Sequence, residues 1–304
     1  MVIAVFGSIN IDLVVTAPHL PHPGETLTGH TFRSVPGGKG ANQAVACARL
    51  GATSRMVGRL GIDSFGAALR AGLTHEGVDA GGVLDDPELP SGMALITVDD
   101  SGENTIVVIP GANSSVGLAE LARLDGLLAE ADVLLLQLEV PLLAVIAAAA
   151  HARTRGVTVI LDPAPAQALP DDLIALVDVL TPNETEAAAL VGFPVASLAD
   201  AARAAEALRA RGARNVVVKR GRAGALVSSA DGTLSLPSFP VVARDTVAAG
   251  DAFNGGLAVA LAEGKPFAEA IRWGLAAGAL AVTRVGAQAA MPTRGEVLAL
   301  LDRA

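Results

Sequence analysis

The sequence is poor in cysteine and in positive charge. Its one cysteine, Cys47, cannot form a disulfide within the chain, which favours a reducing compartment. Lysine and arginine number 22 against 31 aspartates and glutamates, so the formal net charge is −9 at pH 7. Because surfaces that bind nucleic acid are normally basic, this balance argues against a nucleic-acid partner.

No hydrophobic run is long and uninterrupted enough to span a membrane. The most apolar stretch, residues 131–152, is interrupted by Asp132, Gln137, Glu139 and Pro141, and membrane helices rarely tolerate such a polar load. The N-terminus lacks the basic flank of a signal peptide and instead has the pattern of a β-strand. We therefore expect a cytoplasmic protein without a membrane partner.

Three common motifs are also missing, and each absence removes a class of site. Lys39 follows glycines ahead of a helical segment, but Gly40 stands where a Walker A loop needs serine or threonine. No G-x-G-x-x-G follows the first strand, which removes the main support for a dinucleotide oxidoreductase. The five histidines are dispersed and form no H-E-x-x-H or Cys/His cluster, so no zinc site is expected.

The sequence does contain a regular alternation of short aliphatic runs and alanine-rich helical segments. Strands are predicted for residues 2–9, 54–58, 133–138, 158–161, 177–180 and 215–219. Helices are predicted for residues 40–50, 64–76, 141–155 and 198–211. Apolar strands separated by helices predict an α/β fold with a buried, mostly parallel sheet covered on both faces. Ligands bind such sheets beyond the carboxyl ends of the strands.

Two stretches depart from this alternation of strands and helices. Residues 13–17 with 25–35, and later 92–98 with 104–109, have the pattern of hairpin strands joined by turns rich in proline, glycine and aspartate. A chain of 304 residues with 51% apolar content can bury one large core. We therefore expect a single domain over residues 1–304, in which these hairpins (about 13–35 and 92–109) form a small β lid over the site.

The most informative segment, Asp245-Thr-Val-Ala-Ala-Gly-Asp251, precedes an alanine- and leucine-rich helix. Ala248, Ala249 and Gly250 are small, and the first amides of a helix lack intrahelical partners and lie at the positive end of its dipole. These residues can form an anion hole for a transferring phosphoryl group. Asp251 is then placed to take a proton from an attacking hydroxyl. The alternative is that Asp251 only caps the helix.

Polar side chains elsewhere suggest a place for a polyol. Asn10 and Asp12 alternate to the same side of an extended segment, and Glu139 follows an apolar strand at a similar position. Lys39 and Asn42 lie where a glycine-rich turn enters a helix, so they can place an ammonium group and an amide against sugar hydroxyls. The alternative for this turn is a plain helix start.

A third segment places Asn183 and Glu186 three residues apart at the start of a helix, on one helix face. That face can hold phosphate oxygens, and Mg²⁺ through water. The alternative is a capping box without a ligand.

Together these segments resemble the ribokinase/PfkB family of carbohydrate kinases across nearly the whole chain. The resemblance rests on Gly7-Ser-Ile-Asn-Ile-Asp12, Pro23-Gly-Glu-Thr26, Gly37-Gly-Lys-Gly-Ala-Asn-Gln-Ala44, Gln137-Leu-Glu139, Asn183-Glu-Thr-Glu186 and Asp245-Thr-Val-Ala-Ala-Gly-Asp251. It implies a ribokinase-like, Rossmann-type three-layer core with a β lid, and often a homodimer joined through the lids. It also implies transfer of phosphate from ATP, with Mg²⁺, to O5 of D-ribose. The closest alternative is another sugar or a nucleoside as acceptor, such as deoxyribose or fructose. A non-catalytic sugar-binding regulator would normally have lost the base or the anion hole, and both are intact here.

The same resemblance assigns residues to roles. Asp251 is the catalytic base, with Ala248, Ala249 and Gly250 as the anion hole. The implied sugar-binding residues are Asn10, Asp12, Gly38, Lys39, Asn42, Glu139 and Asp251. The implied nucleotide-binding residues are Asn183, Lys219, Gly221, Gly224 and Gly250, and Glu186 binds Mg²⁺ through water.

A K⁺ site is also implied, mainly through backbone carbonyls of two loops. Its implied residues are Asp245, Val247, Arg284 and Gly286. The chain departs from the family pattern at a few positions around these sites. Ala290 stands where serine is frequent, Lys219-Arg220-Gly221 replaces Thr-Leu-Gly, and Leu275 replaces a polar residue near adenine. These departures concern the cation and the phosphate donor more than the sugar.

Overall fold

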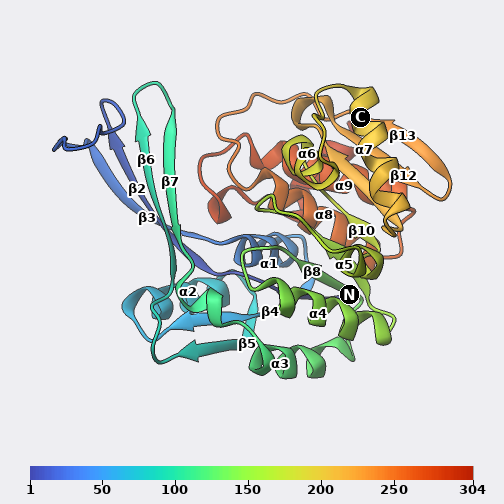
Figure 1. The fold of residues 1–304 in the computed structure, drawn as a ribbon, viewed down its shortest axis with the longest axis horizontal. Coiled ribbons are helices and arrows are strands. Elements are labelled where there is room, and N and C mark those ends of the chain that lie inside the picture. The colour runs from blue at the N-terminus through green and yellow to red at the C-terminus, as the bar shows by residue number, and fades with distance from the viewer. Residues whose placement is uncertain (304) are drawn as a thin grey trace.

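The main body of the protein is built on a nine-stranded sheet with the order β13-β12-β11-β10-β9-β8-β1-β4-β5 (Figure 1). The computed structural model describes residues 1–303. The strands are β1 (Val2–Phe6), β4 (Thr53–Gly61), β5 (Asp79–Asp86), β8 (Val133–Leu136), β9 (Thr158–Leu161), β10 (Val179–Leu180), β11 (Asn215–Lys219), β12 (Ala225–Ser229) and β13 (Gly232–Leu236). From β5 to β11 along the sheet all neighbours are parallel, and β12 and β13 add an antiparallel edge. The predicted α/β fold with a mostly parallel sheet is confirmed.

Helices cover both faces of this sheet, because alternate residues of each strand are buried in opposite directions. In β1, Ile3 and Val5 pack in one cluster and Ala4 and Phe6 in the other. The first cluster includes α1 (Lys39–Arg49), α2 (Ser64–His75), α8 (Ala249–Ala262), α9 (Phe267–Ala281) and α10 (Arg294–Leu301). The second includes α3 (Leu118–Leu128), α4 (Leu142–Thr154), α5 (Asp171–Leu176), α6 (Glu184–Val191) and α7 (Leu198–Ala210). Short 3₁₀ turns occur at η1 (Gly111–Ser115), η2 (Gly221–Ala223) and η3 (Gln288–Ala290). Within residues 1–303, no helix has both the length and the apolar character needed to cross a membrane.

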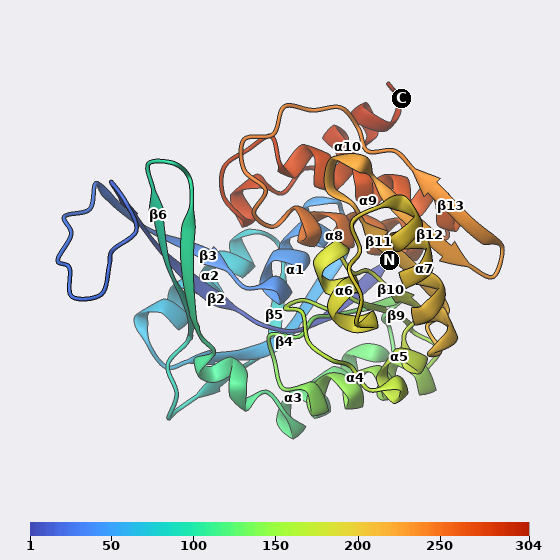
Figure 2. The same ribbon diagram turned by 45° about the horizontal axis from the view of Figure 1, so that its top comes forward.

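A second sheet of four strands, called the lid sheet below, stands away from the main body (Figures 1 and 2). It contains β3 (Thr31–Gly37), β2 (Asn10–Ala17), β6 (Gly92–Asp99) and β7 (Asn104–Ile109), in that order. The chain leaves the main sheet after β1 and enters the lid sheet at Asn10. It returns through Gly37 directly into α1, so both ends of this excursion open onto the same region of the molecule.

Some predicted boundaries were wrong. The strand predicted to begin at residue 25 begins at Thr31. Glu25 instead closes a loop, where its carboxylate accepts hydrogen bonds from the His22 amide and the His19 ring, each at 3.0 Å. The first strand ends at Phe6 rather than residue 9. Strand β5, with the sequence Asp-Ala-Gly-Gly-Val-Leu-Asp-Asp, was not predicted because glycine and aspartate are rare in strands.

Candidate active site

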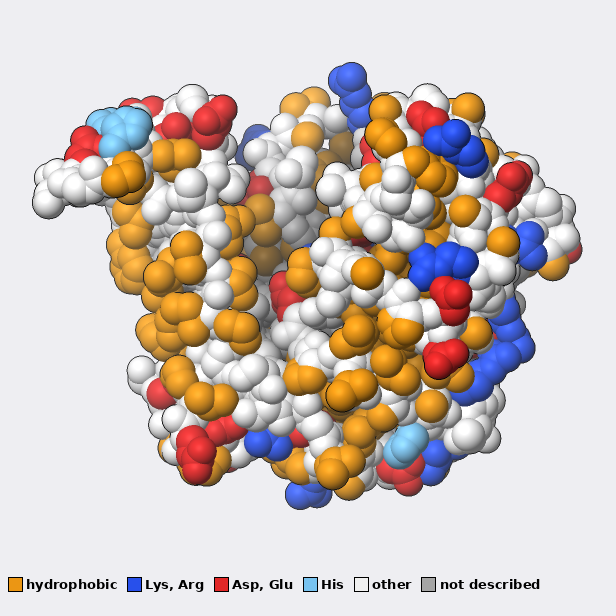
Figure 3. Space-filling view, viewed as in Figure 1, with side chains coloured by type: hydrophobic (Ala, Val, Ile, Leu, Met, Phe, Trp, Pro, Cys, Tyr) orange, Lys and Arg blue, Asp and Glu red, His pale blue; other side chains and the backbone are white. Residues whose placement is uncertain are grey.

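The site predicted from the sequence lies at the carboxyl ends of the central strands. Asp162 follows β9 directly, Asn183 follows β10 after two residues, and Lys219 is the last residue of β11. Glu139 lies three residues beyond the end of β8. Figure 3 shows the groove between the lid sheet and the main body above this edge, with acidic side chains inside it. Open parallel sheets bind their ligands at this edge.

Asp251 lies in the first turn of α8 and is almost fully buried, with 4% of its surface exposed. Its Oδ2 accepts a hydrogen bond from Nδ2 of Asn42 at 3.0 Å, and its Oδ1 accepts one from Nε2 of Gln43 at 3.1 Å. Burial raises the pKa of Asp251 from 3.8 to about 6; the charge of Lys39 opposes this shift and that of Asp162 adds to it. A carboxylate with a pKa near 6 is a stronger base than an exposed aspartate and is still ionised at pH 7.

Asn42 also offers a group that the protein leaves unused. Its Oδ1 is buried and has no hydrogen-bond partner within residues 1–303, while its Nδ2 is engaged by Asp251. A buried acceptor without a partner costs free energy unless a ligand or water donates to it. A hydroxyl group bound beside Asp251 would satisfy this oxygen.

Glu139 and Lys39 meet at the start of α1. The Oε2 atom of Glu139 accepts hydrogen bonds from Oγ of Ser8 at 2.5 Å and from the backbone amide of Lys39 at 3.0 Å. Burial alone lowers the pKa of Lys39, but the carboxylates around it, led by Asp251, raise it above its ordinary value. Lys39 therefore stays charged. The turn before it requires Gly38, whose φ is 87° and where a Cβ would lie 2.6 Å from the amide nitrogen of Asn10.

The lid sheet contributes Asn10 and Asp12 from β2. The side chain of Asn113 donates to Oδ1 of Asn10 at 2.7 Å and so fixes the orientation of that amide. Burial raises the pKa of Asp12 to about 6, and the negative charges of Glu139 and Asp251 add to the effect. The predicted sugar-binding residues from four separate segments therefore lie in one cluster, which the sequence alone could only suggest.

The predicted anion hole has the geometry of an open helix start. Ala248 has a φ of 57°, the left-handed conformation, and its carbonyl accepts the first α-helical bond of α8 from the amide of Ala252 at 2.9 Å. Of the amides that precede that bond, the Ala249 amide donates a long hydrogen bond to the Thr246 carbonyl at 3.4 Å, and those of Gly250 and Asp251 have no backbone acceptor within residues 1–303. Lys219 lies beside them, because a Cβ built on Gly250 would be 3.3 Å from the ammonium nitrogen. The same nitrogen donates to Oδ1 of Asp162 at 2.7 Å.

Asn183 and Glu186 form the capping box that was the alternative to a ligand site. The Glu186 carboxylate accepts hydrogen bonds from the backbone nitrogen of Asn183 at 2.7 Å and from the side-chain Nδ2 of Asn183 at 2.8 Å. In return, the backbone nitrogen of Glu186 donates to Oδ1 of Asn183. Burial raises the pKa of Glu186, which Lys219 opposes and Asp162 reinforces. The electrostatic coupling to Lys219 and Asp162 places this carboxylate in the same cluster, so capping and a ligand role are compatible.

The remaining predicted nucleotide residues lie in the turn after β11. Gly221 begins η2 and Gly224 follows it, with φ values of 52° and 89°, a conformation that favours glycine. A Cβ on Gly224 would lie 2.7 Å from the amide nitrogen of Ser238. Gly224 is thus required by close backbone packing whether or not it contacts a nucleotide.

Asp245 joins the two loops predicted to bind K⁺. Its Oδ1 accepts from the amide of Val247 at 3.0 Å and its Oδ2 from the amide of Gly286 at 2.9 Å. Arg284 instead forms an ion pair with Glu296. Within residues 1–303, no three His, Cys, Asp or Glu side chains are grouped as metal ligands, so any cation here would depend mainly on backbone carbonyls.

Three functional-site side chains were missed by the sequence analysis, namely Gln43, Gln137 and Asp162. All are buried in the cluster around Asp251. Asp162 had a usable signal, because it follows an apolar strand as Glu139 does. Gln43 and Gln137 lie within the quoted motifs, but nothing in their spacing indicates contact.

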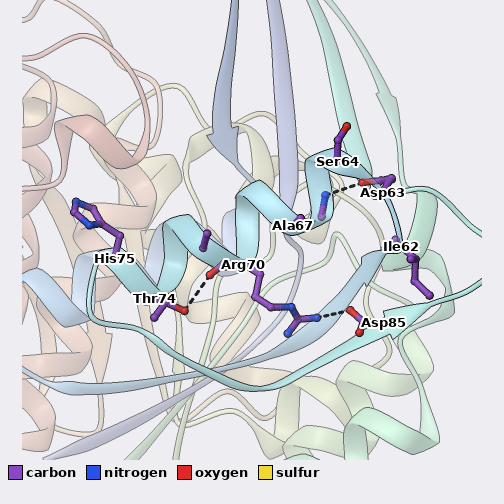
Figure 4. A pocket seen from close by; sticks show the side chains of 11 residues that line it. Ile62, Asp63, Ser64, Ala67, Arg70, Thr74, His75 and Asp85 are labelled. Carbon is purple, nitrogen blue, oxygen red and sulfur yellow. Dashed lines mark hydrogen bonds and ion pairs between the residues drawn. The ribbon is translucent and has the colours of Figure 1, made fainter.

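A separate surface cavity lies away from this cluster. It has a volume of about 1060 Å³ and lies beside α2 and the ends of β4 and β5. Figure 4 shows Arg70 in this cavity donating to Asp85 and Asp63 capping the start of α2. It contains none of the predicted site residues, and it is an open surface groove rather than part of the cluster around Asp251.

Comparison with known proteins gives a consistent picture. The chain is 45% identical to a protein named ribokinase from Haemophilus influenzae over 99% of each chain. It is similar to the crystal structure of ribokinase from Thermotoga maritima, with a TM-score of 0.90 and 39% identity over 99% of each chain. It is also similar to Arabidopsis thaliana ribokinase complexed with ribose and ATP, with a TM-score of 0.92 and 34% identity over 99% of this chain and 98% of the other. Residues 2–294 match the pfkB family carbohydrate kinases, and the chain belongs to that family.

Proposed function

We propose that this protein is a ribokinase, which transfers the γ-phosphoryl group of ATP to O5 of D-ribose. The observation that carries the proposal is the arrangement at Asp251. A buried carboxylate with a pKa raised to about 6 lies in the first turn of α8 and is bonded to Asn42, whose Oδ1 has no partner within residues 1–303. The similarity to ribokinases over the full chain supports ribose and ATP as the substrates.

The sugar is held between the lid sheet and α1. Asp12 and Asn10 approach it from the lid sheet, and Asn42, Lys39 and Glu139 approach it from the main body. Gly38 has no side chain, so the backbone at this residue can approach the sugar closely. Charged and amide groups that fix hydroxyls in a buried site penalise sugars that lack a hydroxyl, because the protein group is then left unpaired.

The reaction is an in-line displacement at phosphorus. O5 of ribose attacks the γ-phosphorus, the bond to the β–γ bridging oxygen breaks, and ADP leaves with that electron pair. Asp251 accepts the proton from O5. The amides of Ala249 and Gly250, in the turn that Ala248 begins, stabilise the charge on the transferred group, and Lys219 adds a fixed positive charge beside them.

The cluster also fits a divalent cation. Glu186 is oriented by Asn183, and Asp162 and Asp251 add further negative charge nearby. This acidic excess would repel a polyphosphate unless a cation accompanied it. Glu186 would hold Mg²⁺ through water, and the ion would neutralise phosphate charge when bound.

K⁺ is proposed as an activator at the loops joined by Asp245. The two hydrogen bonds from Val247 and Gly286 to its carboxylate hold these loops together, and the first loop continues into Ala248. Arg284 and Gly286 would contribute backbone carbonyls. A cation there would stiffen the turn that forms the anion hole without touching either substrate.

A homodimer through the lid sheets is proposed from their exposed apolar surface. Phe32, Ile106, Val107 and Val108 have exposed fractions of 64%, 54%, 60% and 53%, and Figure 3 shows hydrophobic side chains gathered over this sheet. Such patches on soluble proteins mark interaction sites. The buried Cys47 needs no oxidising environment, which agrees with a cytoplasmic enzyme.

Sedimentation velocity tests the dimer. Adjacent strand residues point to opposite faces, so the double variant Ile106→Glu/Val107→Glu puts charge on both faces of β7. We expect the wild type to sediment as a dimer and the double variant as a monomer. Leu143→Glu on α4, an exposed apolar position outside the lid sheet, is the matched control and should remain dimeric. A dimeric double variant would contradict the proposal.

The proposed reaction is tested by a panel of sugars and nucleosides with MgATP. ADP release is followed in a coupled assay and the product is identified by ³¹P and ¹³C NMR. We expect D-ribose to give the highest kcat/KM and a phosphate on C5. A higher kcat/KM for deoxyribose, fructose or a nucleoside would replace ribose as the substrate, and no turnover with any acceptor would reject the proposal.

A further inference from the structure

Gln43 lies between two buried carboxylates. It is on α1, fully buried, and its Nε2 atom donates to Oδ1 of Asp251 and to Oδ2 of Asp162, both at 3.1 Å. Its Oε1 accepts a hydrogen bond from Nε2 of Gln137 at 2.7 Å. Every hydrogen-bonding atom of the Gln43 side chain is therefore engaged.

The chemistry of the amide suits this position. An ionised carboxylate only accepts hydrogen bonds, and a glutamine NH₂ group has two N–H bonds to donate, so one amide can serve two carboxylates. The orientation of the amide follows from its surroundings, because reversing it would place Oε1 against Asp251 and Asp162. Gln137, which is itself fully buried, fixes the other end of the amide.

The same contacts extend to the nucleotide side of the site. Asp162 is 1% exposed and also accepts from Lys219 at 2.7 Å, the lysine beside Gly250. A chain of hydrogen bonds thus runs from Gln137 through Gln43 to Asp251, with a branch through Asp162 to Lys219. Among residues 1–303, Gln43 is the one side chain that bonds to both carboxylates.

We propose that Gln43 is a positioning residue for proton transfer, which orients the Asp251 carboxylate toward the acceptor hydroxyl. The proposal rests on the proposed kinase function. Gln43 itself does not touch the sugar, since both ends of its amide are occupied by protein groups. Loss of Gln43 should therefore impair the chemical step more than sugar binding.

The direction of the pH effect follows from the charges around Asp251. Lys39 and Asn42 face it from α1, Asp12 faces it from the lid sheet, and Asp162 faces it from the end of β9. Burial and Asp162 raise the pKa of Asp251, whereas Lys39 and the hydrogen bonds from Asn42 and Gln43 lower it. Removing the Gln43 donor raises that pKa further.

Gln43→Leu tests the proposal, because leucine fills a similar volume and donates nothing. We expect kcat for ribose to fall about 10- to 100-fold, the worth of one hydrogen bond to a charged group, with KM changed less than about threefold. The acidic limb of the kcat profile should move to higher pH. Ser54→Ala is the matched control: it removes a buried 2.8 Å hydrogen bond to the Ala44 carbonyl of α1, and should leave kcat and the pH profile nearly unchanged. A Gln43→Leu enzyme with wild-type kcat and pH profile would overturn the proposal.

Two further measurements keep the test decisive. If Gln43→Leu does not fold, Gln137→Leu removes only the bond that anchors the amide, and a smaller loss of kcat with unchanged KM is expected; unchanged kcat overturns the proposal.

A double-mutant cycle on melting temperature needs no activity. Gln43→Leu should lower Tm more in the Asp251 protein than in the Asp251→Asn protein, and additive changes would contradict the coupling. A wild type without kinase activity but with a non-additive cycle would reject the proposed function and leave the contact between Gln43 and Asp251 established.

Discussion

Replacement of Asp251 by asparagine separates the catalytic role of this carboxylate from its structural one. The side chain is buried, accepts from Asn42 and Gln43, and has a pKa raised from 3.8 to about 6. Asparagine keeps the shape but cannot accept the proton from O5. We expect kcat to fall about 10²- to 10⁴-fold, the usual range for removing a general base.

The same substitution lowers activity but should not lower the stability of the folded protein. A raised pKa in the folded state means that folding favours the protonated form of Asp251, so its ionisation destabilises the protein as pH rises through about 6. This rise in the pKa of Asp251 corresponds to a destabilisation of ~3 kcal/mol at neutral pH. The asparagine side chain has one oxygen for the two donors, Asn42 and Gln43. One donor is then left without an acceptor, which destabilises the variant by about 1–3 kcal/mol. The net change is between about zero and +2 kcal/mol, or up to about 5 °C in Tm.

The assays are steady-state kinetics, circular-dichroism melting and calorimetric titration with ribose. Asp251→Asn should bind ribose, melt at or slightly above the wild-type temperature at pH 7.5, and lose this advantage toward pH 5, where Asp251 becomes protonated in the wild type. A variant that keeps more than about a tenth of wild-type kcat would refute the general-base assignment. A clearly lower Tm would refute the electrostatic reasoning.

Three further outcomes are expected. The value of kcat/KM for ribose should fall at least tenfold per pH unit below about pH 6, because Asp251 and Asp12 both have pKa values of about 6; a flat profile down to pH 5 would contradict the raised values. Ribose should exceed 2-deoxyribose in kcat/KM by about 5- to 150-fold, since the missing hydroxyl would leave one acceptor, either Asp12 or the Asn42 oxygen that has no partner within residues 1–303, without its donor at about 1–3 kcal/mol; equal values would favour a broader specificity. K⁺ should raise the initial rate severalfold over Na⁺ at constant ionic strength despite Ala290, and no response would exclude a functional site at the Asp245 loops.

Local patterns were enough to predict much of the fold. Strands of continuous apolar residues, such as β9 and β11, were predicted with their observed bounds. A strand that is buried on both faces of the sheet needs a continuous run of apolar residues, and such a run is readily recognised in the sequence. Strand β5 was not predicted, since its aspartates and glycines make it a strand only through pairing with β4. Strand β10 has two residues and is likewise defined by its neighbours.

The residues of the candidate site likewise divide into those that the sequence predicts and those that it does not. Asp251, Asn183 and Lys39 stand at helix starts, and that position carries a chemical meaning readable from the chain itself. Gln43 contacts Asp251 across 208 residues of sequence and Asp162 across 119. Such contacts depend on how α1 and α8 pack together over the sheet. No spacing rule within one sequence encodes them.

The acidic character of the chain is consistent with a polyphosphate substrate once the local charges are considered. Asp162 and Asp251 are buried close to the proposed phosphate position, and either would repel ATP if left alone. Lys219 is paired with Asp162 at 2.7 Å, and the charge of Lys39 partly offsets the rise that burial causes in the pKa of Asp251. The two lysines thus compensate part of this negative charge, while the start of α8 adds a positive field that does not depend on net charge. A net charge of −9 therefore argues against a nucleic-acid surface but not against a phosphoryl-transfer site, because nucleic-acid binding depends on the charge of an extended surface whereas phosphoryl transfer depends on a few buried groups.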